Sequence, residues 1–218
     1  QPWLRALSTV TLQIQPGHEE SNIGDISVQE FRIICALVQA QADAGDATAQ
    51  QQLGVINYRG VPEGGIKIDH AAAAFWFEKA AQAGLAPAQC NLGLLLLLGH
   101  GVPVDDRLGA HWISKAADAG LAPAQNHYGK LFQEGRGVKT KKPLTRAVQY
   151  FQKAADQGET NAMVNLAAAH IDGRGCPKDL AKARSLLTVA ASKGDDDAAQ
   201  LLCRMDKPAQ QPTAAERV

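Results

Sequence analysis

The histidines and cysteines are the residues of this sequence that could carry nucleophilic, acid–base or metal chemistry. The four cysteines form no Cys-x-x-Cys pair. Together with the six histidines they form no Cys/His cluster at zinc-ligand spacing. The sequence also lacks a phosphate-binding loop, a dinucleotide fingerprint, a His-Glu-x-x-His motif and a Gly-x-Ser-x-Gly motif. We therefore expect no catalytic residues, no metal and no cofactor.

One set of reactive side chains could still converge. His127 and His170 fall on related helices in neighbouring repeats of the chain, and Asp172 follows His170 closely. If these three lie together, the chain could be an enzyme or a small-molecule binder. We favour the alternative, that both histidines are ordinary polar positions on helices. Cys176 is expected in a loop as the most accessible thiol, and no base is evident beside it.

The composition indicates an ordered helical protein without a strong electrostatic field. Of the 218 residues, 45% are hydrophobic, 20% are charged and 5% are aromatic, and abundant alanine favours closely packed helices. Lys plus Arg and Asp plus Glu both number 22, so nothing favours nucleic acid or an anionic membrane as partner. We interpret Lys139, Lys141 and Lys142 as a solvated loop. No apolar run approaches the roughly 20 residues of a membrane-spanning helix.

A repeated heptapeptide shows how the chain is built. AGLAPAQ occurs at 83–89 and again at 119–125, and internal periods are typical of repeat architectures. Equivalent glycines recur at intervals of 39, 36, 38 and 36 residues, at Gly45, Gly84, Gly120, Gly158 and Gly194. Four repeats therefore lie between the first and the last of these glycines.

Each repeat begins with an apolar pattern of helical period. Alanine lies four residues after each of these glycines, a large apolar residue eight after and a small residue nine after. The small position lets another helix approach closely and is filled by Gly54, Gly93, Gly129, Ala167 and Cys203. Cys203 is therefore expected to be a packed thiol. Cys90 falls where other repeats carry polar residues, so we expect it to be partly exposed.

A second helix completes each repeat. A further glycine, at Gly60, Gly99, Gly135 and Gly173, is expected to end the first helix. A turn rich in Gly, Pro and charge follows, and then a helix with a Lys-Ala-Ala or Val-Ala-Ala triplet. Bulky residues three positions before the triplet are interpreted as packing anchors: Trp76, Trp112, Tyr150 and Leu186. Since one helical hairpin buries only one face, stacked hairpins are needed for a continuous core.

The repeat resembles the Sel1-like repeat, a longer relative of the tetratricopeptide repeat. Ala-Gln, Leu-Gly or Tyr-Gly, Gly-x-Gly-Val and Lys-Ala-Ala occur in order in the second and third repeats, whereas Met163 and Val189 depart from the pattern in the fourth. The resemblance implies an all-α fold, a right-handed superhelix of antiparallel helix pairs. It also implies a non-catalytic adaptor that binds a protein or peptide, in bacterial signalling, secretion or the envelope.

The array is expected to cover residues 27–205. It comprises a half repeat at 27–44, repeats at 45–83, 84–119, 120–157 and 158–193, and a terminal helix at 194–205. We interpret residues 1–26 as an irregular extension, in which VTLQIQ alternates like a short strand, and 206–218 as a loose tail. The chain begins at Gln1, so we expect either the cytoplasm or export with removal of a signal peptide.

A partner-binding groove is predicted along the first helices, which line the concave side of such arrays. Five consecutive leucines, Leu94 to Leu98, cover more than one face of a helix, so some are expected in this groove as an apolar seat. The alternatives are that the N-terminal segment or a second copy of the chain, as in a homodimer, covers them. The candidate groove residues are Gln52, Val55, Tyr58, Arg59, Asn91, Leu94, Leu97, Leu98, His127, Lys130, Glu134, Asn165, Ala168 and Asp172.

Overall fold

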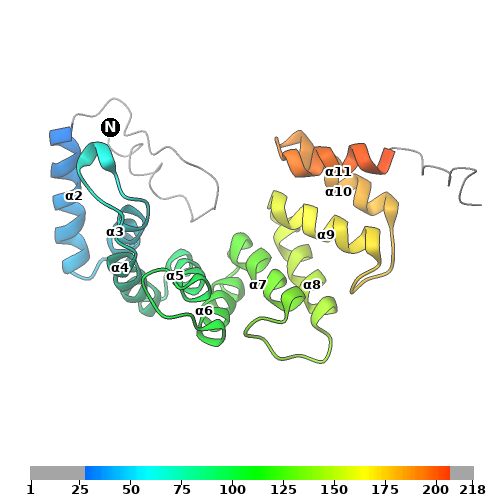
Figure 1. The fold of residues 1–218 in the computed structure, drawn as a ribbon, viewed down its shortest axis with the longest axis horizontal. Helices are drawn as coiled ribbons and strands as arrows, with labels where there is room; N and C mark the ends of the chain where they lie inside the picture. Colours follow the sequence, from blue (N-terminus) through cyan, green and yellow to red (C-terminus); the bar gives the residue numbers. More distant parts are fainter. Residues whose placement is uncertain (1–27, 207–218) are drawn as a thin grey trace, which may run out of the picture. The chain divides into compact units, whose positions relative to one another are not determined.

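The computed structural model describes residues 28–206, which form ten α-helices and one short 3-10 turn (Figure 1). Within that range, extended pairing is limited to one bridge between Val61 and Ile66. The predicted N-terminal extension with its strand-like VTLQIQ, and the predicted tail after Asp206, lie outside the described residues. The chain divides into two compact units, residues 1–124 with 136–138, and residues 125–135 with 139–218.

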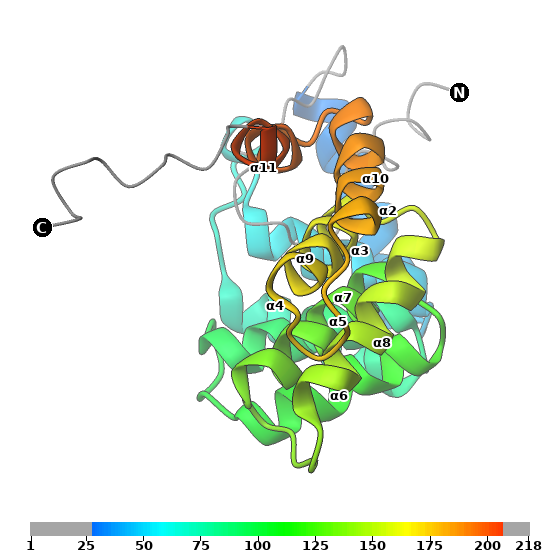
Figure 2. The ribbon, with the colours of Figure 1, turned by 90° about the vertical axis from the view of Figure 1, so that its right-hand side faces the viewer.

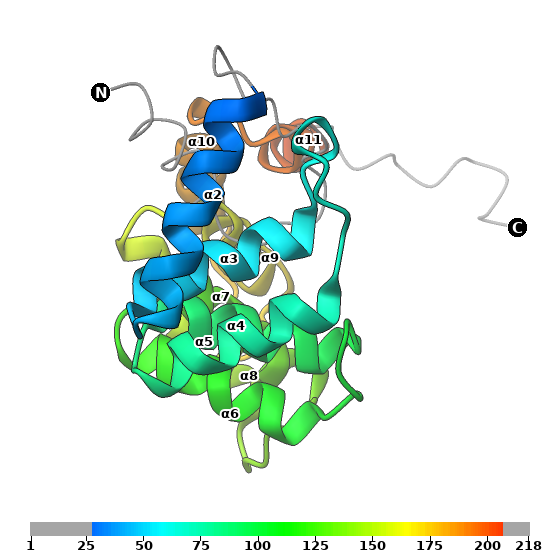
Figure 3. The ribbon, with the colours of Figure 1, turned by 90° about the vertical axis from the view of Figure 1, so that its left-hand side faces the viewer.

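The first unit is a stack of helices that are neighbours in both sequence and space (Figure 3). The 3-10 turn η1 (Pro62–Gly64) contacts the first helix of the stack, and the opening residues of α7 also belong to this unit. The helices are α2 (Val28–Asp43), α3 (Ala47–Arg59), α4 (His70–Gln82), α5 (Ala86–Leu98) and α6 (Asp106–Asp118).

The second unit has the same pattern of successive helices (Figure 2). Its last four helices pack in chain order, each of the first three against the one that follows it. Its helices are most of α7 (Ala122–Glu134), α8 (Pro143–Asp156), α9 (Thr160–Asp172), α10 (Leu180–Ser192) and α11 (Asp196–Asp206).

The predicted helix ends are confirmed. The first helices α3, α5, α7 and α9 each stop one residue before the glycine that was expected to end them. At Gly99 and Gly173 the backbone is left-handed, with φ of 73° and 71°, a conformation that glycine adopts without a Cβ penalty.

The small position of the first helix packs against a large side chain of the second helix. Gly54 faces the ring of Phe77, and Gly129 faces the ring of Phe151; both rings are at most 2% exposed. A Cβ at Gly93 would lie 2.8 Å from the backbone oxygen of Gly109. The prediction that this position lets helices approach closely is therefore confirmed.

Two predictions about cysteines are wrong. Cys203 occupies the small position of α11 but is exposed, because α11 is the last described helix and none of the described helices covers this side of it. Cys90 is 2% exposed, and burial raises the pKa of its thiol to about 12. The polar residues at its position in other repeats gave a misleading signal, because that face of α5 is covered too.

The glutamine that ends AGLAPAQ ties consecutive repeats together. The side-chain Nε2 of Gln89 donates a hydrogen bond of 3.2 Å to the carbonyl oxygen of Ala81 at the end of α4. Gln50 makes the same bond, of 3.1 Å, to Ala42. Each bond is a second one for its carbonyl at the helix end, since Ala81 and Ala42 also accept from the backbone N–H of Gly84 and Gly45.

The aromatic anchors are half-buried and each lies under a lysine. Trp76 packs on the core formed by α2 and α3, and Trp112 on the core formed by α3, α4 and α5, which confirms their packing role. The ammonium of Lys115 lies 4.6 Å from the centroid of a Trp112 ring, and Lys153 lies 5.0 Å from that of Tyr150. The lysine of the Lys-Ala-Ala triplet therefore makes a cation–π contact one helical turn along.

Candidate protein-binding site

In the first unit, the predicted groove residues of α3 and α5 divide into buried and accessible sets. Val55, Asn91 and Leu97 are at most 8% exposed, so these three lie inside the fold and do not form a surface. Leu98 is 52% exposed. The remaining candidates here are half-buried: Gln52, Tyr58, Arg59 and Leu94.

The run of leucines is used mainly for packing within the repeat. Leu95 and Leu96 belong to the core shared by α3, α4 and α5. Leu97 packs on Gly109 of α6, where a Cβ would lie 2.9 Å from its Cγ. The apolar surface on α5 is therefore limited to Leu98 and the accessible part of Leu94, a narrower seat than five leucines predict.

In the second unit, the predicted groove residues of α7 and α9 form a mostly polar surface. Lys130, Glu134 and Asp172 are exposed, whereas His127, Asn165 and Ala168 are half-buried. The Nδ2 of Asn165 donates a 2.8 Å hydrogen bond to Oδ1 of the buried Asn126. Asn165 thus links α7 and α9, the two first helices of this unit.

A corresponding pair of amides lies inside the first unit. Gln51 and Asn91 have the same repeat positions as Asn126 and Asn165, and they are 2% and 0% exposed. Neither side chain has a hydrogen-bond partner among the described residues. Leaving two buried amides unpaired costs free energy, whereas the equivalent Asn126 and Asn165 pair with each other.

His127 is the groove candidate whose ionisation is most altered by the fold. Burial and, to a lesser extent, the charge of Lys130 lower the pKa of His127 from 6.5 to about 4. The unfolded chain binds a proton at this histidine below pH 6.5, while the folded protein does not until pH 4. This contribution to stability is complete above pH 6.5 and declines as the pH falls from 6.5 towards 4.

Replacing His127 with glutamine should therefore remove part of the acid sensitivity of folding. We expect the free energy of unfolding of the unaltered chain to fall by about 2 kcal/mol more than that of the variant between pH 7 and pH 4. Urea denaturation across this range measures the difference. A variant of the exposed His111 is the control, and equal pH dependence in the His127 variant and the unaltered chain would contradict the assignment.

The reactive side chains singled out in the sequence do not assemble as a set. His170 is 7% exposed, and its Nδ1 lies 3.2 Å from the oxygen of Pro177 and 3.5 Å from Sγ of Cys176. A base does therefore lie beside Cys176, contrary to expectation. No hydrogen bond or ring contact in the described part of the chain joins His127 to His170. Residues 28–206 also contain no group of three His, Cys, Asp or Glu side chains able to hold a metal.

The Gly-x-Gly turns create a feature that sequence reasoning missed. The second glycine of each turn lies against the first turn of the preceding second helix: Gly101 against His70, Gly137 against Asp106 and Gly175 against Leu144. A Cβ at any of these glycines would overlap that backbone. The residue between the two glycines is therefore held at the junction of two repeats; we call His100, Arg136 and Arg174 the junction residues.

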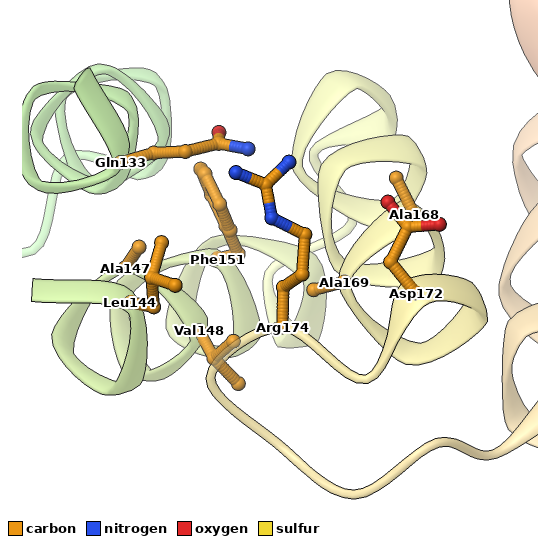
Figure 4. Close-up of a pocket in the computed structure, with 9 residues that line it drawn as sticks. All are labelled: Gln133, Leu144, Ala147, Val148, Phe151, Ala168, Ala169, Asp172 and Arg174. Atoms are coloured by element: carbon orange, nitrogen blue, oxygen red, sulfur yellow. The ribbon is translucent and has the colours of Figure 1, made fainter.

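Each junction residue meets a different environment. The ring of His100 stacks on that of His70 at 4.9 Å, and its Nδ1 lies 3.4 Å from the hydroxyl of Tyr58. Arg136 forms a 2.6 Å ion pair with Asp106 and donates a 3.0 Å hydrogen bond to the carbonyl of Leu97. Arg174 lies over a small cavity in the second unit (Figure 4).

These helix pairs define an all-α repeat solenoid, and comparison with known proteins supplies the family. The sequence profile of the Sel1 repeat matches residues 47–85, 86–121, 122–159 and 160–195, so the chain belongs to the Sel1 repeat family. Each match starts two residues after the repeat boundary predicted from the glycines. Proteins of this family are in general non-catalytic scaffolds for protein interactions. No helix in residues 28–206 is long and apolar enough to cross a membrane.

Individual relatives come from plants and bacteria. The chain is 32% identical over 152 residues to HRD3B of Arabidopsis thaliana, an ERAD-associated E3 ubiquitin-protein ligase component; the match covers 70% of this chain and 17% of HRD3B. Among solved structures, a Sel1 repeat protein from Oxalobacter formigenes has a TM-score of 0.74 at 28% identity, covering 85% of this chain and 74% of that one. The protective antigen c5321 of uropathogenic Escherichia coli has a TM-score of 0.71 at 33% identity, covering 78% and 36%.

Proposed function

We propose that this chain is a non-catalytic scaffold that holds a partner protein or peptide against the first helices of its repeats. The observation that carries the proposal is membership of a family of interaction scaffolds, joined to an accessible apolar residue on a first helix. Leu98 is 52% exposed, and half-buried Leu94 lies one helical turn before it on α5. An exposed apolar side chain with polar neighbours is a common anchor for a partner segment. A bacterial setting stays a prediction.

Replacing both Leu94 and Leu98 with serine tests the first-helix surface. We expect the double variant to retain less than a tenth of the partner captured by the unaltered chain, because anchor residues dominate binding energy. Partners cross-linked to the unaltered chain in cells are identified first, and their retention by the variant is then measured. Circular dichroism at 222 nm should show unchanged helical content.

A matched variant separates a specific loss from a general loss of apolar surface. Leu180 and Val189 of the second helix α10 are 50% and 43% exposed, and their double serine variant should capture as much partner as the unaltered chain. Equal capture by all three proteins would reject α5 as the docking surface. The rival explanation is that a second copy of the chain covers Leu94 and Leu98. Sedimentation tests it: the unaltered chain would then be a dimer and the double serine variant a monomer.

A further inference from the structure

The junction of the second and third repeats shows how this fold holds an arginine. Arg136, between the glycines of its turn, pairs with the carboxylate of Asp106 at 2.6 Å. Its guanidinium also donates to the carbonyl oxygen of Leu97. The acid comes from the first turn of the preceding second helix, so the chain itself satisfies the charge of this arginine.

The junction of the third and fourth repeats also has an arginine, Arg174, but no acid at the position of Asp106. Gly175 lies against the backbone of Leu144 as Gly137 lies against that of Asp106, so Leu144 occupies the place of the acid. Gln133 has the repeat position of Leu97. Within residues 28–206, the side chain of Arg174 makes no hydrogen bond and no ion pair.

A small cavity lies beside this unpaired guanidinium. Its volume is about 30 Å³, enough to admit a water molecule. In Figure 4 the guanidinium of Arg174 extends towards the amide of Gln133 and lies beside Phe151. The rest of the lining is mainly apolar: Leu144, Ala147, Val148, Ala168 and Ala169. Asp172 also lines the cavity, and its carboxylate lies apart from the guanidinium in this view.

We propose that Arg174 binds an aspartate or glutamate side chain of a partner protein, which would pair with it as Asp106 pairs with Arg136. The carboxylate would accept hydrogen bonds from the guanidinium and from the amide of Gln133, and a small apolar neighbour in the partner would cover the cavity. A guanidinium forms paired hydrogen bonds with a carboxylate. One arginine with one amide matches a monoanion better than a phosphate, which needs more cationic groups. The inference rests on the proposed scaffold function, because its ligand is a protein side chain.

Short peptides test the site directly. The probe is acetyl-Ala-Asp-Leu-Ala-amide, and the readout is the Nε–Hε resonance of Arg174 in the full chain by NMR. We expect a saturable shift with the aspartate peptide and binding at least about tenfold weaker with its asparagine counterpart, since charge-assisted hydrogen bonds are the stronger ones. An asparagine peptide with a free C-terminal carboxylate separates the two sources of the anion; tighter binding of this peptide would overturn the side-chain assignment.

Variants of the chain give an internal check. Leu144→Asp restores the acid that Arg136 finds in Asp106, and it should abolish the shift; Leu144→Asn is its matched control and should preserve the shift. Asp172→Asn removes a competing anion from an exposed position and should tighten binding a fewfold. Equal binding of the aspartate and asparagine peptides would refute the proposal. So would unchanged affinity of the aspartate peptide for Arg174→Gln, which is measured by titration calorimetry because this variant lacks the reporting resonance. Asp172→Asn and Arg174→Gln change exposed residues, so they still test the proposal if Leu144→Asp does not fold.

The outcome also separates this inference from the scaffold function. If partner capture depends on Leu94 and Leu98 but no peptide binds at Arg174, only the inference of an acidic ligand is rejected. If a peptide binds at Arg174 but no partner is captured, the Arg174 site is supported and the first-helix surface is rejected.

Discussion

Replacing Phe77 with alanine should lower the free energy of unfolding by about 4 kcal/mol, the usual cost of deleting a buried aromatic ring. The ring is 0% exposed and belongs to the core shared by α3, α4 and α5. One of its faces lies on Gly54, where no side chain can move in to fill the space. The loss should appear as a lower midpoint in urea denaturation followed by circular dichroism.

Phe75 on the same helix provides the matched control. Its ring is 49% exposed and contacts Lys79 at 4.7 Å. Phe75→Ala should cost less than about 1 kcal/mol, since little apolar area leaves the interior. If the two phenylalanine variants were equally stable, the core between the helix pairs would not be the main source of stability.

Replacing Gly137 with alanine should cost about 3 kcal/mol, although it adds only one methyl group. The backbone φ at Gly137 is 66°, a left-handed value that costs an alanine roughly 1–2 kcal/mol. The new Cβ would also overlap the carbonyl of Asp106 and approach the Cβ of Ala110 to 2.8 Å. Relieving this overlap requires the turn to move off α6, which would also disturb the pair between Arg136 and Asp106.

Gly135, two residues earlier, separates the two contributions. Its φ is 71°, but a Cβ there would meet no atom within 4 Å. Gly135→Ala should therefore cost only the conformational part, about 1 kcal/mol. Thermal melts of the two variants measure the difference, and equal melting temperatures would show that the contact between the turn and α6 does not stabilise the fold.

The helices and their ends could be predicted because their signals are local. The period of alanine and leucine gave the first helices, and Gly60, Gly99, Gly135 and Gly173 gave their ends, which the structure confirms. The small positions could also be predicted, since a glycine packs against a large side chain at the same spacing in the first three repeats. The all-α repeat solenoid and the Sel1 family follow from these same residues.

What the sequence did not show depends on neighbours that are distant along the chain. Cys203 follows the rule for a buried position, yet it is exposed because no described helix covers that side of α11. Asn91 and Leu97 follow the rule for surface positions and are buried. The accessible groove residues as a binding surface, the acidic ligand of Arg174, and the domain limits at the two ends stay predictions.

The contact between the second turn glycine and the preceding helix has a consequence for how such a chain can diversify. Two backbones touch there, so the spacing of the helix pairs is set without any side chain. The residue between the glycines is then free to change its chemistry while the architecture stays the same. At three successive sites this chain already has a stacked imidazole, an arginine paired with an acid, and an exposed arginine without a protein partner among the described residues. New specificities could thus arise by single substitutions at these sites, with little penalty in folding.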